Sequence, residues 1–525
     1  MAVLLLGGVQ LRSWTWQQTE RVRFEWDIRN GFYWGERTLK QGERVTGTSL
    51  ATASRWESWR IWAAGYLTLY DALELESANR DYGLDYPPLR LMAMSLWAKS
   101  VRAAHPEAQI AKAEEYGQPL LRFNLLCEGL AALGMFLLVR HWVKRDSGRT
   151  VPLFARGVSA EWHGWTRGFL AAAFVWLNPA IILTSHAWPQ WDVWIVPFYL
   201  FAALFASTQR WFWCGCLLAI GGMLKGQLFI VAPFFILWPI FQQRPDAALR
   251  VVCGFAVALA AILSPWLLND ARDRLVWVLV VGCSALVLMF AKRSRQHAAF
   301  YLPVVAAVAA FMIGAISGGS FGWLRVGFIY GADLPQGLLG GTGAVAGACY
   351  NLPSLLATLG LSLKHKLFEL DFGIVTVALT LQWALRLLYF CGVAGCAMWV
   401  ARRARADDAK ALLAVAAPWL LMLALLGQMR ERYSLWAAAV TAVTVALSMR
   451  LSVLHLIFSL LSTAMIAHVM LAEKQFDPSP QLLDFLDAQH VLAAWIFLIS
   501  AALYLAAAGG APEFARRLIA NVRRT

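Results

Sequence analysis

One aspartate near the amino terminus has surroundings that suit acid–base chemistry. Asp27 lies in the aromatic stretch Phe24–Trp34, directly after an apolar start. Aromatic neighbours can partly desolvate a carboxylate, which moves its pKa toward the range in which it acts as a general base. An ordinary solvated carboxylate paired with Arg29 or Arg23 is the alternative.

A second aspartate, Asp85, is held on a stiff turn. It lies in the segment Tyr82–Leu89, which reads Tyr-Gly-Leu-Asp-Tyr-Pro-Pro-Leu. The two prolines restrict the backbone and exclude helix through Tyr86, so the acid sits on an ordered loop. It can belong to a catalytic site, or it can cap the helix that we expect over Leu89–Val101.

Three polar side chains cluster where one apolar run ends and the next begins. His186, Gln190 and Asp192 all lie in the segment Asn178–Asp192. Polar groups at a tight hairpin inside a membrane are costly unless they line a cavity, which favours a binding site. Histidine and tryptophan are also common at membrane interfaces, so interfacial anchoring is the alternative.

Charged groups occur at two further breaks between apolar runs. Lys225 and Gln227 lie at one break, and Arg430, Glu431 and Arg432 lie at another. Ammonium and guanidinium groups suit phosphate oxygens, so these cations are candidates for holding a phosphate. The alternatives are snorkelling of the lysine to the interface, interfacial anchoring of the arginines, and an internal pair with the glutamate.

The elements that must position these residues are membrane-spanning helices. Of the 525 residues, 59% are hydrophobic and 15% are charged, an apolar share far above that of a soluble domain. We therefore expect an all-α polytopic integral membrane protein with about 13 to 14 transmembrane helices, each built on an apolar run of roughly 20 residues. The predicted runs are Leu120–Val139, Gly168–Ser185, Trp191–Phe205, Trp211–Leu224, Leu228–Phe241, Val251–Leu268, Leu275–Phe290, Ala298–Ile316, Phe372–Val400, Ala411–Leu426, Ser434–Met449, Leu451–Leu471 and Leu492–Ala507.

The positions of lysine and arginine predict the orientation of these helices. Positive connections stay in the cytoplasm. Lys144–Arg149, Arg402–Arg405 and the tail after Gly510 are positive, whereas Ser317–Asp371 is mixed in sign. This pattern places the first ~120 residues outside the cytoplasm. It also accounts for the net charge of +14 without nucleic acid as a partner.

The predicted organisation follows from the same pattern. Residues 1–119 contain a partial first helix, Met1–Leu11, and a large extracytoplasmic loop that carries Asp27. Residues 120–316 form a transmembrane bundle, 317–371 a long extracytoplasmic loop, 372–509 the C-terminal transmembrane helices, and 510–525 a basic cytoplasmic tail. The 8 cysteines are scattered, and Cys214 and Cys216 lack the further ligands of a zinc site, so we expect no metal and no cofactor.

The motifs and their order resemble those of a known family. The chain is similar to the polyprenol-phosphate-sugar-dependent glycosyltransferases of GT-C fold, most closely the asparagine-linked-glycosylation glucosyltransferases of the dolichyl-phosphate-glucose type. The family's Gly-Leu-Asp-Tyr-Pro-Pro-Leu run matches Tyr82–Leu89. Its Asp-His-Gly-His-Phe-Gln-Tyr-Asn hairpin resembles Ser185–Asp192, its Phe-Lys-Gln-Met segment resembles Leu224–Gln227, and its His-Glu-Lys motif resembles Arg430–Arg432.

The resemblance implies a hexosyltransferase that works on the extracytoplasmic face with inversion at the anomeric carbon. Its partners would be a polyprenyl-phosphate-sugar donor, a lipid-linked or glycan acceptor, and membrane lipids. Asp27 matches the family's catalytic base. The expected site comprises Asp27 and Asp85 as catalytic aspartates, Arg430, Arg432, Lys225 and His186 at the donor phosphate, and Tyr86, Gln190, Asp192, Gln227 and Glu431 as support.

The chain also departs from the family pattern. Arg430 replaces the family's histidine, which keeps a positive charge but loses a proton donor. Ser185 replaces an aspartate, and Gly35–Asn79 is a longer insert than in the eukaryotic enzymes. The Gln-Met-Arg-Glu-Arg-Tyr form resembles bacterial members, so the bacterial plasma membrane is expected ahead of the endoplasmic reticulum. Sugar and acceptor stay open.

Two other functions are compatible with these residues. A non-catalytic carrier or flippase for lipid-linked sugars would use the same cations to bind phosphate, although paired hydropathy halves typical of alternating-access transporters are not clear in the chain. Transfer to a protein acceptor is a third reading, which an organic extraction of the product would distinguish.

Overall fold

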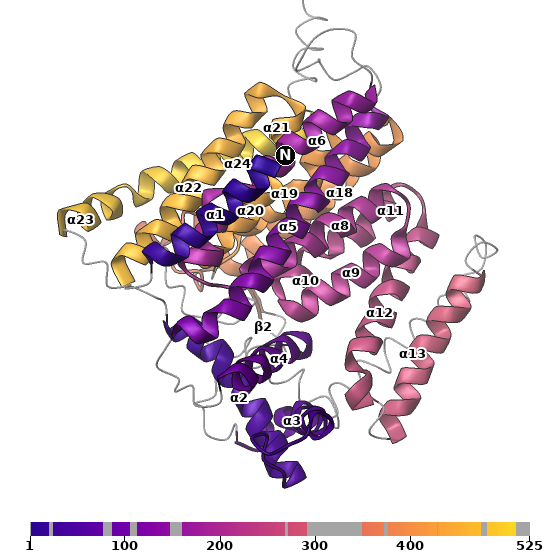
Figure 1. Cartoon of the computed structure of the whole chain (residues 1–525). Helices are drawn as coiled ribbons and strands as arrows, with labels where there is room; N and C mark the ends of the chain where they lie inside the picture. The colour runs from indigo at the N-terminus through magenta and orange to yellow at the C-terminus, as the bar shows by residue number, and fades with distance from the viewer. Residues whose placement is uncertain are drawn as a thin grey trace, which may run out of the picture.

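The computed structural model describes residues 2–19, 25–76, 87–105, 113–146, 160–267, 271–290, 349–371, 376–427, 429–473 and 480–510. Within these residues the chain is helical almost throughout (Figure 1). A two-stranded antiparallel sheet is the exception in this part of the chain: β1 (Lys366–Asp371) pairs with β2 (Thr376–Thr380). The all-α class expected from composition is therefore confirmed for the described residues.

Several helices have the length and composition of membrane spans. Five described segments are long and apolar enough to cross a bilayer. They lie in α5 (Ala113–Arg145), α12 (Pro245–Leu267), α18 (Leu381–Arg405), α22 (Met449–Glu473), and α23 (Pro480–Ala488) continued by α24 (His490–Gly509). The chain is thus a multi-pass integral membrane protein.

Shorter apolar helices complete the bundle. They are α8 (Ile195–Ser207), α9 (Trp211–Leu224), α10 (Gln227–Val231), α11 (Pro233–Phe241), α13 (Ala271–Phe290) and α19 (Ala411–Leu425). The predicted run Ala298–Ile316 lies outside the described residues. The predicted run Gly168–Ser185 is broken: α6 (Ala160–Trp176) ends before Pro179, and α7 (Pro179–Ile182) follows at a 41° bend.

Two predicted spans were wrong in their bounds. Phe372–Val400 is not a single helix, because its residues 376–380 form β2, which pairs with β1, and α18 starts only at Leu381, after the N-cap Thr380. Ser434–Met449 is divided into α20 (Ser434–Val440) and α21 (Val443–Leu447). Its threonine hydroxyls donate back to carbonyls of the preceding turn, a bond pattern that bends helices.

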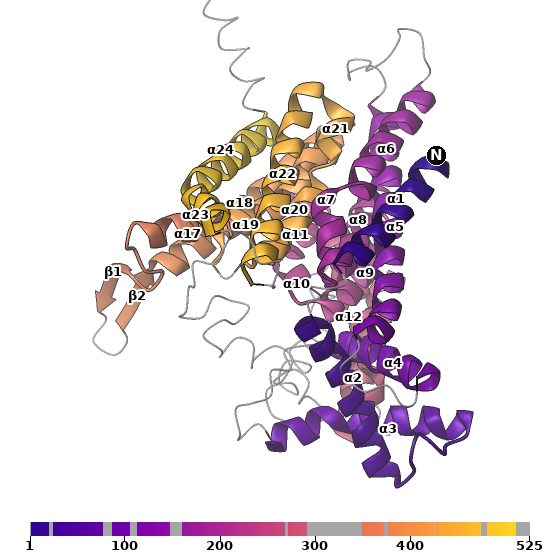
Figure 2. The same cartoon turned by 60° about the vertical axis from the view of Figure 1, so that its left-hand side comes forward.

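The N-terminal part forms two groups. Helix α1 (Ala2–Gln18) runs beside α5 and α6, whereas α2 (Glu25–Thr46), α3 (Arg55–Glu76) and α4 (Pro88–Ala104) gather at one end of the molecule (Figure 2). Helices α2 and α3 approach very closely, since a Cβ on Gly65 would lie 1.8 Å from the carbonyl oxygen of Thr38. The region expected as a large loop is therefore largely helical between residues 25 and 104.

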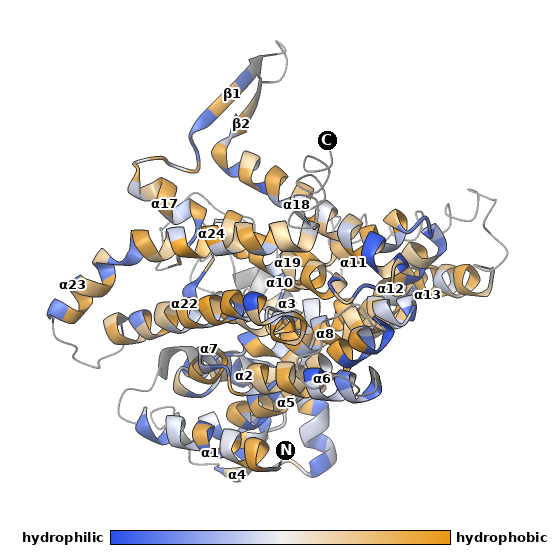
Figure 3. Cartoon of the chain, turned by 90° about the horizontal axis from the view of Figure 1, so that it is seen from above, coloured by the Kyte–Doolittle hydropathy of each residue, from blue (hydrophilic) through white to orange (hydrophobic). Residues whose placement is uncertain are grey.

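The outer surface of the bundle is apolar. On α24, Leu492, Trp495, Ile499 and Leu503 are all more than half exposed and recur every three or four residues. The opposite face of the same helix buries Phe497 and Ala501. An exposed apolar stripe of this kind is costly in water and suits lipid contact. Hydrophobic residues, drawn in orange, occur along most of the helices in Figure 3.

Candidate active site

Three charged side chains from distant parts of the chain meet inside the bundle. Asp192 is fully buried, and its carboxylate pairs with the ammonium of Lys225, which is 6% exposed. The Nε atom of Arg432 lies 3.4 Å from the other carboxylate oxygen of Asp192. We call these residues the Asp192 cluster. Its two cations and one carboxylate leave a net positive charge among apolar helices.

Each member of the Asp192 cluster lies where a helix is interrupted. Asp192 begins the short 3-10 turn Asp192–Trp194, after Pro189. Lys225 has an extended backbone that separates α9 from α10. Arg432 lies in the 3-10 turn Glu431–Tyr433 that leads into α20. Irregular backbone within a membrane is tolerated where it is enclosed in protein or lines a cavity, so these breaks mark a polar site.

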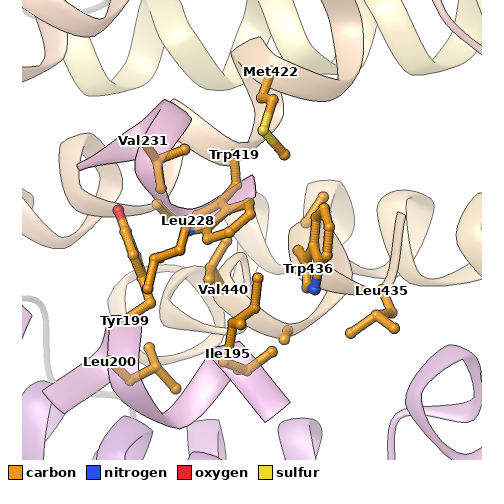
Figure 4. Close-up of a cluster of buried hydrophobic side chains, with 14 of the residues drawn as sticks. Ile195, Tyr199, Leu200, Leu228, Val231, Trp419, Met422, Leu435, Trp436 and Val440 are labelled. Carbon is orange, nitrogen blue, oxygen red and sulfur yellow. The ribbon is translucent and has the colours of Figure 1, made fainter. Parts of the chain in front are cut away.

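Aromatic rings line the Asp192 cluster. Tyr433 and Trp436 stack with centroids 4.7 Å apart, and the Lys225 ammonium lies 4.4 Å from the Tyr433 centroid. The Trp436 indole donates to the backbone oxygen of Asp192 at 2.8 Å. Figure 4 shows Trp436 among buried side chains of α8, α10, α19 and α20, so the hydrophobic core holds this wall in place.

The predicted glutamines lie beside the same cluster. The Gln227 amide nitrogen lies 3.5 Å from the Tyr433 hydroxyl, to which it donates. Gln190 is fully buried, and among the described residues neither atom of its side-chain amide has a hydrogen-bond partner. Its backbone oxygen is held by the Asn124 amide at 2.9 Å. A buried amide without a partner costs free energy, so Gln190 offers a donor and an acceptor to a bound molecule.

His186 has a carboxylate partner that the sequence did not indicate. Its Nε2 atom lies 3.2 Å from Glu128, whose other oxygen pairs with Arg12 of α1. All three side chains are at least 95% buried. Arg12 also donates to the Trp176 carbonyl at 2.7 Å and lies over the Trp176 ring. His186 therefore faces Glu128, on the π-helical turn Leu183–Ala187.

Helix α5 links this triad to the Asp192 cluster. Asn124 and Glu128 are one turn apart on one face of α5. The Asn124 amide donates to the backbone oxygens of both Ser185 and Gln190, each at 2.9 Å. It thus fixes the hairpin that carries His186 and Asp192. A polar pair at this spacing within an apolar run was a signal available in the sequence, and our sequence analysis missed it.

The predicted base lies on a helix that packs against this hairpin. Asp27 belongs to the first turn of α2, but its side chain is outside the described residues. One turn later, a Cβ on Gly31 would lie 2.7 Å from the ring of Trp191, the neighbour of Asp192. The buried guanidinium of Arg90, also missed by the sequence analysis, lies 4.1 Å from the Trp191 centroid.

The remaining predicted residues are Asp85, Tyr86, Arg430 and Glu431. Asp85 and Tyr86 lie outside the described residues. Helix α4 begins at Pro88, one residue before the predicted Leu89, and its N-cap Pro87 makes no side-chain hydrogen bond. Arg430 is exposed, whereas Glu431 beside it is 5% exposed. Among the described residues, no group of three or more metal-ligating side chains occurs.

Comparison with known proteins adds no relative. No protein-family model matches the chain, and no curated protein is similar to it.

Proposed function

We propose that the protein is a membrane hexosyltransferase, of the GT-C glycosyltransferase type, that uses a polyprenyl-phosphate-sugar donor. The observation that carries this proposal is the Asp192 cluster. A buried cation, a half-buried cation, a buried amide and aromatic rings meet at helix breaks within an apolar bundle. A lipid-linked phosphate combines the two properties that such a site recognises, a charged group and a long apolar chain.

In this proposal the cations hold the donor phosphate. Asp192 pairs with Lys225 and lies close to Arg432, so it fixes both cations in place while leaving the cluster positive. Preorganised charge in a water-poor site stabilises a phosphate that gains charge as it departs. Arg430, which is exposed and lies two residues before Arg432 in the chain, is assigned as a further cation for the phosphate. No metal ion needs to be invoked for this task.

The acceptor side is assigned to Asp27. The acceptor hydroxyl oxygen attacks the anomeric carbon and loses its proton to the Asp27 carboxylate, while the bond between the anomeric carbon and the phosphate oxygen breaks. The phosphate leaves with the bonding electrons, and the configuration inverts. Support comes from Trp191, which contacts the α2 helix of Asp27 and precedes Asp192 in the chain. The acceptor is a lipid-linked or glycan hydroxyl.

The test is transfer from radiolabelled polyprenyl-phosphate-glucose and -mannose by the purified protein, with membrane lipid extract as acceptor. We expect transfer by the wild type and its loss in Asp27→Asn. Asp408→Asn is the matched control, because it removes a carboxylate from the Arg403 pair at the far end of the bundle. Full transfer by Asp27→Asn would remove the base from the proposal, and donor binding without transfer in every protein would favour a carrier.

A further inference from the structure

We propose that a cavity in the α2–α4 group binds the anionic part of a saccharide, a phosphate or carboxylate carried by a sugar. The cavity has a volume of about 750 Å³. It lies between the loop that joins α2 to α3 and the side of α4, at the end of the molecule seen at the bottom of Figure 2. Its wall includes Glu43, Arg55, Trp59, Lys99 and Arg102.

One cation in this wall is already compensated. The Arg102 guanidinium donates to Glu36 at 2.6 Å and lies 3.7 Å from Glu43. Glu43 also accepts a 2.7 Å hydrogen bond from the backbone N–H of Leu50, which ties down the loop before α3. Arg102, Glu36 and Glu43 thus form the frame of the cavity, and both carboxylates have partners.

Two other cations in the wall have no carboxylate partner in the part of the chain that the structure describes. Among the described residues, neither Lys99 nor Arg55 forms an ion pair. The Lys99 ammonium lies 3.8 Å from the centroid of Trp59. Partial burial, and then the neighbouring charge of Arg55, lower the pKa of Lys99, which agrees with two uncompensated cations facing one space. A bound anion would relieve their repulsion.

The rest of the wall suits a sugar. Trp59 is 42% exposed and packs edge-on against Trp62 at 5.5 Å. Trp62 is itself held, because its indole donates to Ser95 at 2.7 Å and its ring stacks on Tyr66. An anchored, partly exposed indole offers an apolar surface to the C–H groups of a sugar ring. Ser58 and Ser100 also line the cavity. The Ser58 hydroxyl already donates to the Ser54 carbonyl at 3.0 Å, so it can accept from a sugar hydroxyl, while Ser100 can donate or accept.

The ligand class follows from this combination of groups. Lys99 and Arg55, which form no ion pair within the described residues, favour an anionic ligand. The Trp59 indole and the serine hydroxyls favour a sugar that carries the anion over an inorganic ion. Most of this wall belongs to Gly35–Asn79, the segment that departs from the resembled family. Identifying the ligand as part of the acceptor rests on the proposed transfer. Binding of the anionic saccharide to the cavity does not depend on transfer.

The experiment measures ligand binding to the full-length protein in detergent without donor. Glucose 1-phosphate, glucuronic acid, glucose and inorganic phosphate are each titrated, and hydrogen exchange is followed in residues 47–59 and 96–103. We expect glucose 1-phosphate and glucuronic acid to protect both segments, about tenfold more tightly than glucose and less tightly as salt is added. Inorganic phosphate should bind more weakly than glucose 1-phosphate.

Variants locate the site. Lys99→Met and Arg55→Gln should each weaken glucose 1-phosphate binding by about tenfold, and Lys99→Arg should restore it. Lys40→Met is the matched control, since Lys40 is an exposed cation of α2 that does not line the cavity. Trp59→Leu should reduce the preference for glucose 1-phosphate over inorganic phosphate.

The outcomes separate this inference from the proposed transfer. Equal binding of glucose and glucose 1-phosphate, equal binding of inorganic phosphate, or unchanged binding by Lys99→Met would each overturn it. Asp27→Asn should bind glucose 1-phosphate like the wild type, because the cations assigned to the anion are Lys99 and Arg55. Binding with no transfer by any protein would therefore contradict the proposed function and leave the anion site standing.

Discussion

At the scale of single residues, Asp192 is the member of the site on which the others depend. Removing one partner of a buried ion pair leaves an uncompensated charge, which costs about 3–5 kcal/mol. We expect Asp192→Asn to lose stability of that size, because Lys225 would stay buried without its carboxylate. The double variant Asp192→Asn/Lys225→Met should be less destabilised than the sum of its single variants. Thermal unfolding in detergent measures all of these variants.

The control for this cycle is the Arg403–Asp408 pair, which is more exposed. Asp408→Asn should cost less than Asp192→Asn, because the Arg403–Asp408 pair keeps partial contact with water. Strict additivity of the Asp192 and Lys225 substitutions would show that the two side chains do not interact.

Gln190 tests whether the site is kept for binding rather than for stability. Its side-chain amide is buried without a partner among the described residues, a state that costs about 1–3 kcal/mol. Gln190→Leu should therefore leave the melting temperature unchanged or raise it, while transfer from the labelled donor falls. A loss of both stability and transfer would instead mean that the amide has a structural partner. Gln227→Leu, at a half-buried neighbour, is the comparison.

At the scale of elements, helix ends determine where polar groups can lie. Helix α9 ends at Lys225, and α20 begins after the turn that carries Arg432. At such ends the backbone leaves the regular hydrogen-bond pattern, and side chains can turn inward toward a common centre. The site therefore depends on breaks in the helices as much as on the residues themselves.

We predict that the stability of the start of α3, which lies outside the bundle, depends on pH. Ser54 and Glu57 cap one another, as the Ser54 N–H donates to Glu57 at 2.8 Å and the Glu57 N–H donates to the Ser54 hydroxyl at 3.3 Å. Hydrogen bonding of the Glu57 carboxylate to the Ser54 side chain, and then to the Ser54 backbone N–H, lowers the pKa of Glu57. The stabilisation of this helix start is thus fully present above the ordinary glutamate pKa and lost as pH falls through the lowered value.

The measurement for this capping box is amide hydrogen exchange in residues 54–58, corrected for the intrinsic effect of pH. Protection in the wild type should fall on acidification, and Glu57→Gln should remove that dependence. An equal fall of protection in Glu57→Gln would assign the pH effect to another group.

At the scale of the whole molecule, the orientation in the membrane is testable. The positive-inside pattern places the α2–α4 group and the α5 end that carries Lys144 on opposite sides. Trp56 is 76% exposed on α3, and Lys144 is 56% exposed. In a background without reactive native cysteines, Trp56→Cys should react with a membrane-impermeant maleimide in intact cells. Lys144→Cys should react only after permeabilisation, and the reverse result would invert the topology.

The candidate site was only partly predictable. Asp192, Lys225, Arg432 and Gln190 stood out as polar residues at breaks in apolar runs, and the structure brings them together. The pairing of His186 with Glu128 was not predictable, because the partner sits within a long helix and a third residue comes from α1. Asp27 and Asp85 remain predictions, since the structure does not describe their side chains.

Membrane insertion and helix content follow from the chain directly, because hydropathy is a local property that adds up along some 20 consecutive residues. Two departures could be seen only with the strand partner and the hydroxyl bonds that the fold supplies: residues 376–380 form a strand, and Ser434–Met449 is divided. The Asp192 cluster could be recognised only from the tertiary structure. Lys225 meets Asp192 across 33 residues, and Trp436 meets it across 244. Such contacts depend on how helices pack, and packing is decided by shape and charge between segments rather than by the order of residues within any one of them.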